Sequence, residues 1–128
     1  MVFVTKKTAI SNDLARPNEP AVLILTSLAS GTKHGYALTK DIEEFAGVEL
    51  GPGTLYGALA RLVERGLIAP VPSEDRRQPY EITASGRAAL TDTVRAMQSL
   101  ANEGAARLRL RNVARPLLPI ATTPRLVR

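Results

Sequence analysis

Apolar residues recur at helical spacing in three successive segments and alternate with polar residues in the segment that follows. Glycine or proline separates these segments. A nearly continuous apolar run, residues 21–25 together with Leu28, makes the first segment a helix that is buried on most sides. In the second segment, Leu38, Ile42 and Phe45 form one amphipathic face. The order predicts three short helices followed by a pair of strands.

The third segment, GPGTLYGALARL at residues 51–62, has two unlike sides. Leucines at helical spacing form its inner face: Leu55, Leu59 and Leu62. The opposite side is small and carries Gly53, Gly57 and Ala60. Glycine inside a helix costs roughly 1 kcal/mol relative to alanine, so the small side calls for an explanation beyond helix formation.

Glycine and proline mark the ends of these helices. Pro20 suits the first turn of the first helix, and Gly47 suits the C-cap of the second. The third helix is expected to span residues 52–65, after which Gly66 ends it. The segment GTKHG is expected to be a turn between the first two helices, with His34 as a turn residue.

Residues 67–83 are expected to form a β-hairpin. Tyr80 and Ile82 alternate with a polar residue, as they would in a half-buried strand. Two prolines confine the first strand to an edge of the sheet, because proline cannot donate to the strand ladder. The loop between the strands is long and carries Arg76 and Arg77 at its tip.

A last long helix is expected to start near Thr83 or Ser85, either of which can cap it, and to end at about Leu110. Apolar and small residues recur along it at alternating steps of four and three, which is a heptad-like seam. The members of this seam are Leu90, Val94, Met97, Ala101, Gly104 and Leu108. The seam predicts dimerisation, because so long a helix exceeds what a small core can cover; packing within its own chain is the alternative.

The composition excludes several classes of protein. The 128 residues fit one domain with tails, and the absence of cysteine together with a single histidine excludes the usual metal sites. No nucleophile–base pair or phosphate-binding loop is present, so no catalytic residue, metal or cofactor is expected. No segment reaches the roughly 18–20 apolar residues of a transmembrane helix, and the N-terminus does not resemble a secretory signal. The expectation is a soluble, cytoplasmic protein without a membrane partner.

The net charge of +5 originates at the C-terminal end. Residues from Arg107 onward contain six arginines and no acid, which leaves residues 1–106 six charges lower, at −1. A high pI therefore does not by itself predict nucleic-acid binding, and local basic clusters must carry that argument. The arginines of the tail fit a solubilising role as well as contact with DNA or a partner.

Three helices followed by a hairpin form the winged helix-turn-helix arrangement, in which the third helix enters the major groove and the hairpin is the wing. The expected fold class is mainly α (α+β), with a long C-terminal dimerisation helix. The expected parts are an N-terminal arm (1–17), a winged helix-turn-helix DNA-binding domain (18–83), a dimerisation helix (84–110) and an Arg/Pro-containing tail (111–128).

Several motifs in this order resemble the PadR family of bacterial transcriptional regulators. They are HGYALTKDI, GTLYGALARLVERGLI and RRQPYEITASGRAAL, and the resemblance extends from about Ala21 to Leu100. The chain departs from the family pattern at Gly57, where proline is usual, and at Pro79, where the wing usually ends in paired aromatics.

The resemblance implies a homodimeric DNA-binding regulator, often a repressor, whose partner is a double-stranded, pseudo-palindromic operator. Because members of the family often respond to phenolic or drug-like molecules, it also implies a small apolar or phenolic effector. The chain has no tryptophan and 4% aromatic residues, so a flat aromatic ligand site is not evident.

The residue types at the small side of the third helix fit DNA recognition. A recognition helix brings its backbone close to base edges and phosphates, which small residues permit, and hydroxyl and guanidinium groups then donate hydrogen bonds. The start of the second helix can hold a phosphate, and the wing arginines can reach the backbone or a minor groove. The predicted DNA-binding residues are Tyr36, Lys40, Gly53, Thr54, Tyr56, Gly57, Arg61, Arg76 and Arg77.

Simpler interpretations compete with this one. Gly57 can be small in order to face a neighbouring helix, Tyr56 can be half-buried against the wing, and the arginine pair can be solvated beside Glu74 and Asp75. The alternative function is a winged-helix protein-interaction module that no longer reads DNA. The net charge of −1 over residues 1–106 favours that alternative.

Overall fold

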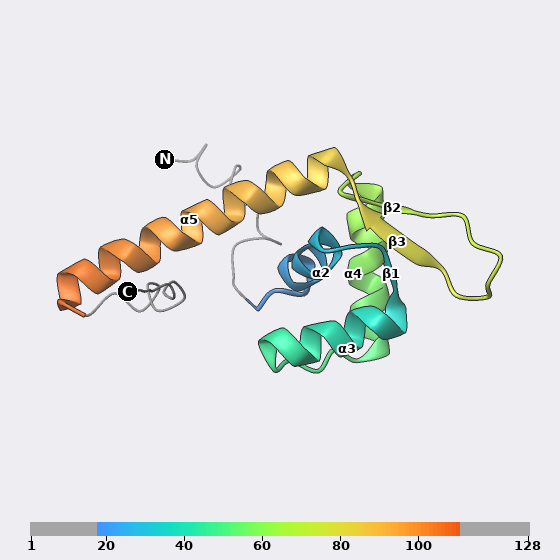
Figure 1. Cartoon of the computed structure of the whole chain (residues 1–128), viewed down its shortest axis with the longest axis horizontal. Coiled ribbons are helices and arrows are strands. Elements are labelled where there is room, and N and C mark those ends of the chain that lie inside the picture. Colours follow the sequence, from blue (N-terminus) through green and yellow to red (C-terminus); the bar gives the residue numbers. More distant parts are fainter. Residues whose placement is uncertain (1–17, 111–128) are drawn as a thin grey trace, which may run out of the picture. The chain divides into compact units, whose positions relative to one another are not determined.

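The computed structural model describes residues 18–110 (Figure 1), so the predicted arm (1–17) and tail (111–128) lie outside the described residues. The fold is mainly helical, as the sequence predicts, and its small sheet has three strands where the sequence predicts a two-stranded hairpin. Its elements are α2 (Pro20–Ala29), β1 (Lys33–His34), α3 (Gly35–Ala46), α4 (Pro52–Glu64), β2 (Ile68–Pro70), β3 (Pro79–Ile82) and α5 (Ala84–Leu108).

The core is built around α2, which packs against α3, α4 and β3. Its apolar run is buried throughout, which confirms the prediction, and Ile24 and Leu25 have no exposed surface. Leu38 and Ile42 of α3 close the core on one side, and the inner face of α4 closes it on another. The buried residues of α4 are Leu55, Ala58, Leu59 and Leu62.

The prediction that Phe45 belongs to the buried face of α3 is wrong. Its side chain is 47% exposed, although it follows Leu38 and Ile42 at helical spacing. The buried residues of α3 end at Ile42, and Ala46, rather than Phe45, packs against the core from the last turn. The ends of α3 and α4 agree with the prediction, because Gly47 caps α3 at a φ of 69° and Gly66 follows α4 at a φ of 74°.

The sheet has the order β1-β3-β2, and all its pairs are antiparallel. The hairpin of β2 and β3 is confirmed, and β2 lies at an edge, where its proline is tolerated. The third strand, β1, falls in the segment that the sequence predicts as a turn. Pro79 pairs with His34 and is the first residue of β3, a position that does not need its missing N–H.

The junction between the sheet and α5 depends on two residues. The Thr83 hydroxyl accepts a hydrogen bond from the Gly86 N–H at 3.0 Å and donates one to the Gly66 carbonyl at 2.7 Å. Of the two predicted candidates, Thr83 and Ser85, Thr83 is therefore the cap. A Cβ atom at Gly86 would lie 2.0 Å from the Leu67 carbonyl oxygen. Only glycine therefore permits this approach of the first turn of α5 to the end of the loop before β2.

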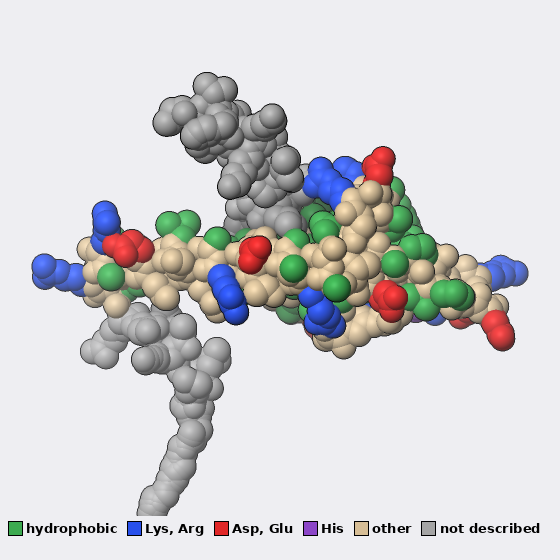
Figure 2. Space-filling model, turned by 90° about the horizontal axis from the view of Figure 1, so that it is seen from above, with side chains coloured by type: hydrophobic (Ala, Val, Ile, Leu, Met, Phe, Trp, Pro, Cys, Tyr) green, Lys and Arg blue, Asp and Glu red, His purple; other side chains and the backbone are tan. Residues whose placement is uncertain are grey.

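The long helix α5 ends at Leu108, close to the predicted Leu110, and Gly86 is its only buried residue. Leu90, the first member of the predicted seam, packs against the core of its own chain. Farther along, Leu100 is 74% and Leu108 69% exposed. Two compact units divide within α5, between Val94 and Arg95. On the face in view in Figure 2, acidic, basic and apolar side chains are interspersed along this helix.

A polar cluster links α2 to the segment that follows it. Ser27 is 1% exposed, and its hydroxyl donates a 2.6 Å hydrogen bond to the Asp41 carboxylate of α3. The Lys33 ammonium group donates to the Ser27 carbonyl and lies 3.9 Å from the same carboxylate. The cluster therefore fixes the relative position of α2, β1 and α3. Within residues 18–110, no helix is both long and apolar enough to cross a bilayer.

Candidate nucleic-acid interface

The outer face of α4 is as open as the sequence predicts. Gly53, Thr54, Tyr56, Ala60 and Arg61 are exposed, and Gly57 is half-buried. The leucines on the other side hold the helix to the core. The result is a helix with a fixed inner face and a low outer face, on which the polar groups of three side chains are accessible.

The glycines of α4 do not pack against another element among the described residues. A Cβ atom added at Gly57 would meet only the Arg61 Nη1 atom, at 3.8 Å, and one added at Gly53 would meet nothing within 4 Å. Close packing against another helix within residues 18–110 therefore does not explain Gly57. The open space that both glycines leave lies on the outer face of the helix.

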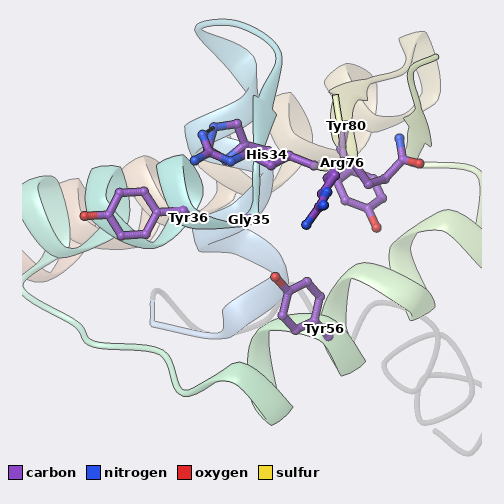
Figure 3. A pocket seen from close by; sticks show the side chains of 8 residues that line it. His34, Gly35, Tyr36, Tyr56, Arg76 and Tyr80 are labelled. Atoms are coloured by element: carbon purple, nitrogen blue, oxygen red, sulfur yellow. Dashed lines mark hydrogen bonds between the residues drawn. The ribbon is translucent and has the colours of Figure 1, made fainter. Parts of the chain in front are cut away.

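Tyr56 leans toward the start of α3. It is 56% exposed, and Figure 3 shows its hydroxyl group pointing toward Gly35. A Cβ atom at Gly35 would lie 2.7 Å from the Tyr56 hydroxyl oxygen, so glycine makes room for the phenol there. The hydroxyl of a residue on α4 is thereby held beside the N-terminus of α3, where unpaired backbone N–H groups favour anions.

The first two turns of α3 carry two further predicted residues. Tyr36 is 65% exposed, and the Lys40 ammonium group lies 6.0 Å from the centre of its ring, at the limit of a cation–π contact. In Figure 3 the Tyr36 ring points away from Tyr56 and Arg76. Tyr36 and Lys40 thus form a pair on the outside of α3, next to the groove described below.

A groove of about 320 Å³ lies between the wing and the start of α3 (Figure 3). Four of its lining residues belong to the predicted DNA-binding set, and the other four lie outside that set. The lining residues are His34, Gly35, Tyr36, Tyr56, Arg76, Arg77, Gln78 and Tyr80. Among the predicted residues, Thr54 and Arg61 lie on α4 outside this lining. A second groove, of about 340 Å³, shares Gly35, Tyr36 and Tyr56 and extends to Pro52 of α4.

The wing arginines differ in their surroundings. The backbone N–H of Arg76 donates to the Asp75 carboxylate at 2.8 Å, so that carboxylate organises the turn. The Arg77 Nη1 atom lies 3.3 Å from the His34 Nε2 atom, 43 residues earlier in the sequence. The arginine pair is therefore not only a solvated loop, because Arg77 reaches the start of α3.

His34 is one of the groove residues that the sequence does not predict as a DNA contact. It caps α3, because its Nδ1 atom accepts a hydrogen bond from the Ala37 N–H at 3.4 Å. Histidine is not among the preferred N-cap residues, and the two-residue strand that contains His34 is too short to show alternation. No pattern within the sequence brings His34 next to Arg77; the pairing of β1 with β3 does.

A three-helix core with an exposed third helix and an adjacent hairpin defines a winged helix-turn-helix protein. The model of the transcriptional regulator PadR-like family matches residues 24–92 of this chain, which is more than half of it. The chain belongs to this family of transcriptional regulators.

Two curated relatives are similar to this chain, and one of them is named a transcriptional regulator. An uncharacterised 37.1 kDa protein of a Streptomyces fradiae transposon is 42% identical over 85 residues, which cover 66% of this chain and 25% of that protein. The transcriptional regulator Rv3488 of Mycobacterium tuberculosis is 41% identical over 86 residues, which cover 62% of this chain and 77% of that protein. The matched part of this chain therefore spans about a quarter of the length of the transposon protein.

Solved structures of related proteins have the same fold. A transcriptional regulator from Clostridium thermocellum matches with a TM-score of 0.60 and 27% identity, covering 69% of this chain and 87% of that chain. A PadR family regulator from Clostridium difficile matches with a TM-score of 0.63 and 24% identity, covering 70% and 97%. The second similarity concerns the fold alone.

Proposed function

We propose that this protein is a sequence-specific DNA-binding regulator that inserts α4 into the major groove. The observation that carries the proposal is the outer face of α4. Among residues 18–110, a Cβ atom at Gly57 would meet only Arg61 within 4 Å, and one at Gly53 would meet nothing. A backbone this accessible can approach base edges closely. In this arrangement Arg61 and Thr54 contact bases or phosphates, and the small residues set the depth of insertion.

The groove beside α4 supports the second half of the proposal, contact with the DNA backbone. Tyr36, Tyr56 and the wing arginines line it, and the Lys40 ammonium group lies 6.0 Å from the centre of the Tyr36 ring on α3. Hydroxyl and guanidinium groups donate to phosphate oxygens, and such contacts fix the register of a protein on the duplex without reading its sequence. The wing and α3 would thus position α4 over the bases.

We further propose that the protein acts as a homodimer and represses transcription. The support is α5, in which Gly86 is the only buried residue although Val94, Met97, Leu100 and Leu108 are apolar. A helix with so little burial in its own protomer gains its stability from a partner helix. Two copies related by a two-fold axis would read a pseudo-palindromic operator with half-sites about one helical turn apart.

A mobility-shift titration with DNA from the promoter region of the protein's own gene tests DNA binding. We expect binding that weakens steeply as the salt concentration rises and that exceeds binding to a scrambled duplex of equal length. Equal affinity for the scrambled duplex at every salt concentration would contradict sequence-specific recognition. Absence of binding to any duplex would favour the protein-interaction module instead.

Two substitutions test whether the outer face of α4 contacts DNA. Tyr56→Phe removes only a hydroxyl and Arg61→Ala removes a guanidinium group, and each is expected to weaken operator binding by about tenfold, the value of one hydrogen bond to a charged group. Arg95→Ala is the matched control, because Arg95 is exposed on α5 and lies off the predicted seam. If Tyr56→Phe and Arg61→Ala bind like Arg95→Ala, the proposed interface is wrong.

Release of the repressor by a small apolar or phenolic molecule completes the proposal. Its support is the apolar surface of Val94 and Met97 on the predicted dimer seam. A panel of phenolic acids and planar drugs should contain a compound that lowers operator affinity and leaves the Val94→Ser variant unaffected. If no compound of the panel changes the operator affinity or the melting temperature of the protein, release by an effector is not part of its function.

A further inference from the structure

We propose that His34 and Arg77 together hold one phosphate group of the DNA backbone in the groove between the wing and α3. The inference rests on the proposed function and deepens it, because it assigns a backbone contact to the only histidine of the sequence. Neither the position of His34 in the sequence nor its residue type marks it as a DNA contact. The geometry around its ring does.

One hydrogen bond of the His34 ring, the one that caps α3, selects a tautomer. The Ala37 backbone N–H donates to Nδ1 at 3.4 Å, and in the tautomer that this bond requires, Nε2 carries the hydrogen of the neutral ring. The Nε2 atom lies 3.3 Å from Nη1 of Arg77, and a guanidinium group has donors only. In the tautomer that caps α3, two donors face each other and neither can satisfy the other.

The side chains that line the groove do not supply an anionic acceptor for these two donors. None of the eight residues that line the groove has a carboxylate side chain. An oxygen about 2.9 Å from both nitrogens, the ordinary length of such a hydrogen bond, fits beside a pair 3.3 Å apart. The positive charge of Arg77 favours an anionic oxygen in this position, such as a phosphate oxygen.

The surroundings of the pair match a phosphate. The site lies at the N-terminus of α3, where the helix dipole favours negative charge. Arg76 adds a second cation to the lining of the groove, and Tyr56 adds a hydroxyl group that points toward Gly35 (Figure 3). Because the wing supplies one donor and the cap of α3 the other, one phosphate would hold both parts of the domain against the duplex.

The single histidine makes the first step of the test direct. In the full-length protein labelled with ¹⁵N-histidine, in mildly alkaline buffer, NMR should show an unprotonated Nδ1 and a protonated Nε2. Adding a promoter-region duplex should shift the Nε2 signal, and adding the same concentration of inorganic phosphate at equal ionic strength should shift it far less. A ring protonated on Nδ1, or a shift produced by inorganic phosphate but not by the duplex, would overturn the proposal.

The second step separates the contact from the helix cap. Asparagine is a strong N-cap residue but does not reach the position of Nε2, so His34→Asn keeps the cap and removes the donor. We expect His34→Asn to bind the duplex about tenfold more weakly than the wild type, with an unchanged melting temperature. Arg77→Ala should bind more weakly still and lower the slope of log affinity against log salt by about one.

A double-mutant cycle then tests whether the two side chains share one phosphate. Combining His34→Asn with Arg77→Ala should cost clearly less than the sum of the two single effects, whereas combining it with Arg61→Ala on α4 should give additive effects. If the wild type binds the duplex and His34→Asn binds equally well, His34 is only a cap and the DNA-binding function stands. If the wild type binds no duplex, the proposed function itself fails.

Discussion

Gly57 and Gly86 both lie within helices, and their surroundings are opposite. A Cβ atom at Gly86 would be 2.0 Å from a backbone oxygen, whereas one at Gly57 would meet only the end of a flexible side chain at 3.8 Å. The sequence shows both as costly residues for a helix. Only the structure separates the glycine that the fold requires from the glycine that leaves an outer surface open.

Gly86→Ala is expected to destabilise the protein by about 3 kcal/mol, because the Leu67 carbonyl oxygen belongs to the backbone and cannot move aside cheaply. Urea unfolding followed by circular dichroism measures the loss. Ser85→Ala is the neighbouring control: Ser85 is exposed, and its substitution should change the free energy of unfolding by less than about 0.5 kcal/mol. Equal stability of the two variants would contradict the close contact at Gly86.

Gly57→Ala is expected to act in opposite directions on stability and on binding. Alanine should stabilise α4 by about 0.5–1 kcal/mol, because its methyl group meets only an ordinary contact. The same methyl group should lower the affinity for the promoter duplex, since it stands on the face proposed to approach the bases. Unfolding curves and binding titrations of one preparation measure both effects. A variant that is more stable and binds as well as the wild type would show that the low face is not needed.

At the scale of elements, the position of each helix follows from its leucines, glycines and prolines, which is why α2, α4 and the hairpin agree with the sequence analysis. The disagreements occur where local pattern carries no information. β1 has two residues, a single period of alternation that cannot show a repeat, and it exists because β3 offers it a partner. Phe45 has the spacing of a core residue, but the buried cluster ends one turn before it.

The link between α2 and α3 depends on a buried hydroxyl group. Ser27→Ala removes the hydrogen bond to the Asp41 carboxylate and should cost about 1–2 kcal/mol of unfolding free energy. Thr26→Ala is the matched control, because Thr26 is exposed and its hydroxyl only bonds to the Val22 carbonyl of its own helix. Thermal unfolding of both variants at one pH makes the comparison. Similar losses in the two would argue against a structural role for the Ser27–Asp41 pair.

The candidate site was predictable in part, and the reason lies in its construction. The residues on α4 follow from the period of one helix, so Thr54, Tyr56 and Arg61 could be assigned to one face from the sequence. His34 and Arg77 are 43 residues apart and meet through strand pairing. A single sequence contains no signal for such a meeting, because it depends on the register of β1 against β3.

At the scale of the whole molecule, α5 is expected to set the oligomeric state. Met97→Glu places a charge on the predicted seam and should convert a dimer to a monomer, because a buried, unpaired carboxylate at a helix interface is strongly unfavourable. Light scattering after size-exclusion chromatography measures the mass. Ser99→Glu is the control, since Ser99 is exposed on the opposite side of the helix from the seam. A Met97→Glu variant that stays dimeric would place the interface elsewhere.

The sheet order also affects the entropy of binding. The base of the wing is held on both sides before any duplex arrives, because β3 lies between β1 and β2. Only the tip, residues 71–78, has to lose conformational freedom when it meets the DNA, and one of its side chains is already placed against the start of α3. Ordering the backbone of one residue costs on the order of 1–2 kcal/mol of conformational entropy. Because the two-residue strand β1 already orders the base of the wing in the free protein, binding to DNA carries less of this entropic cost.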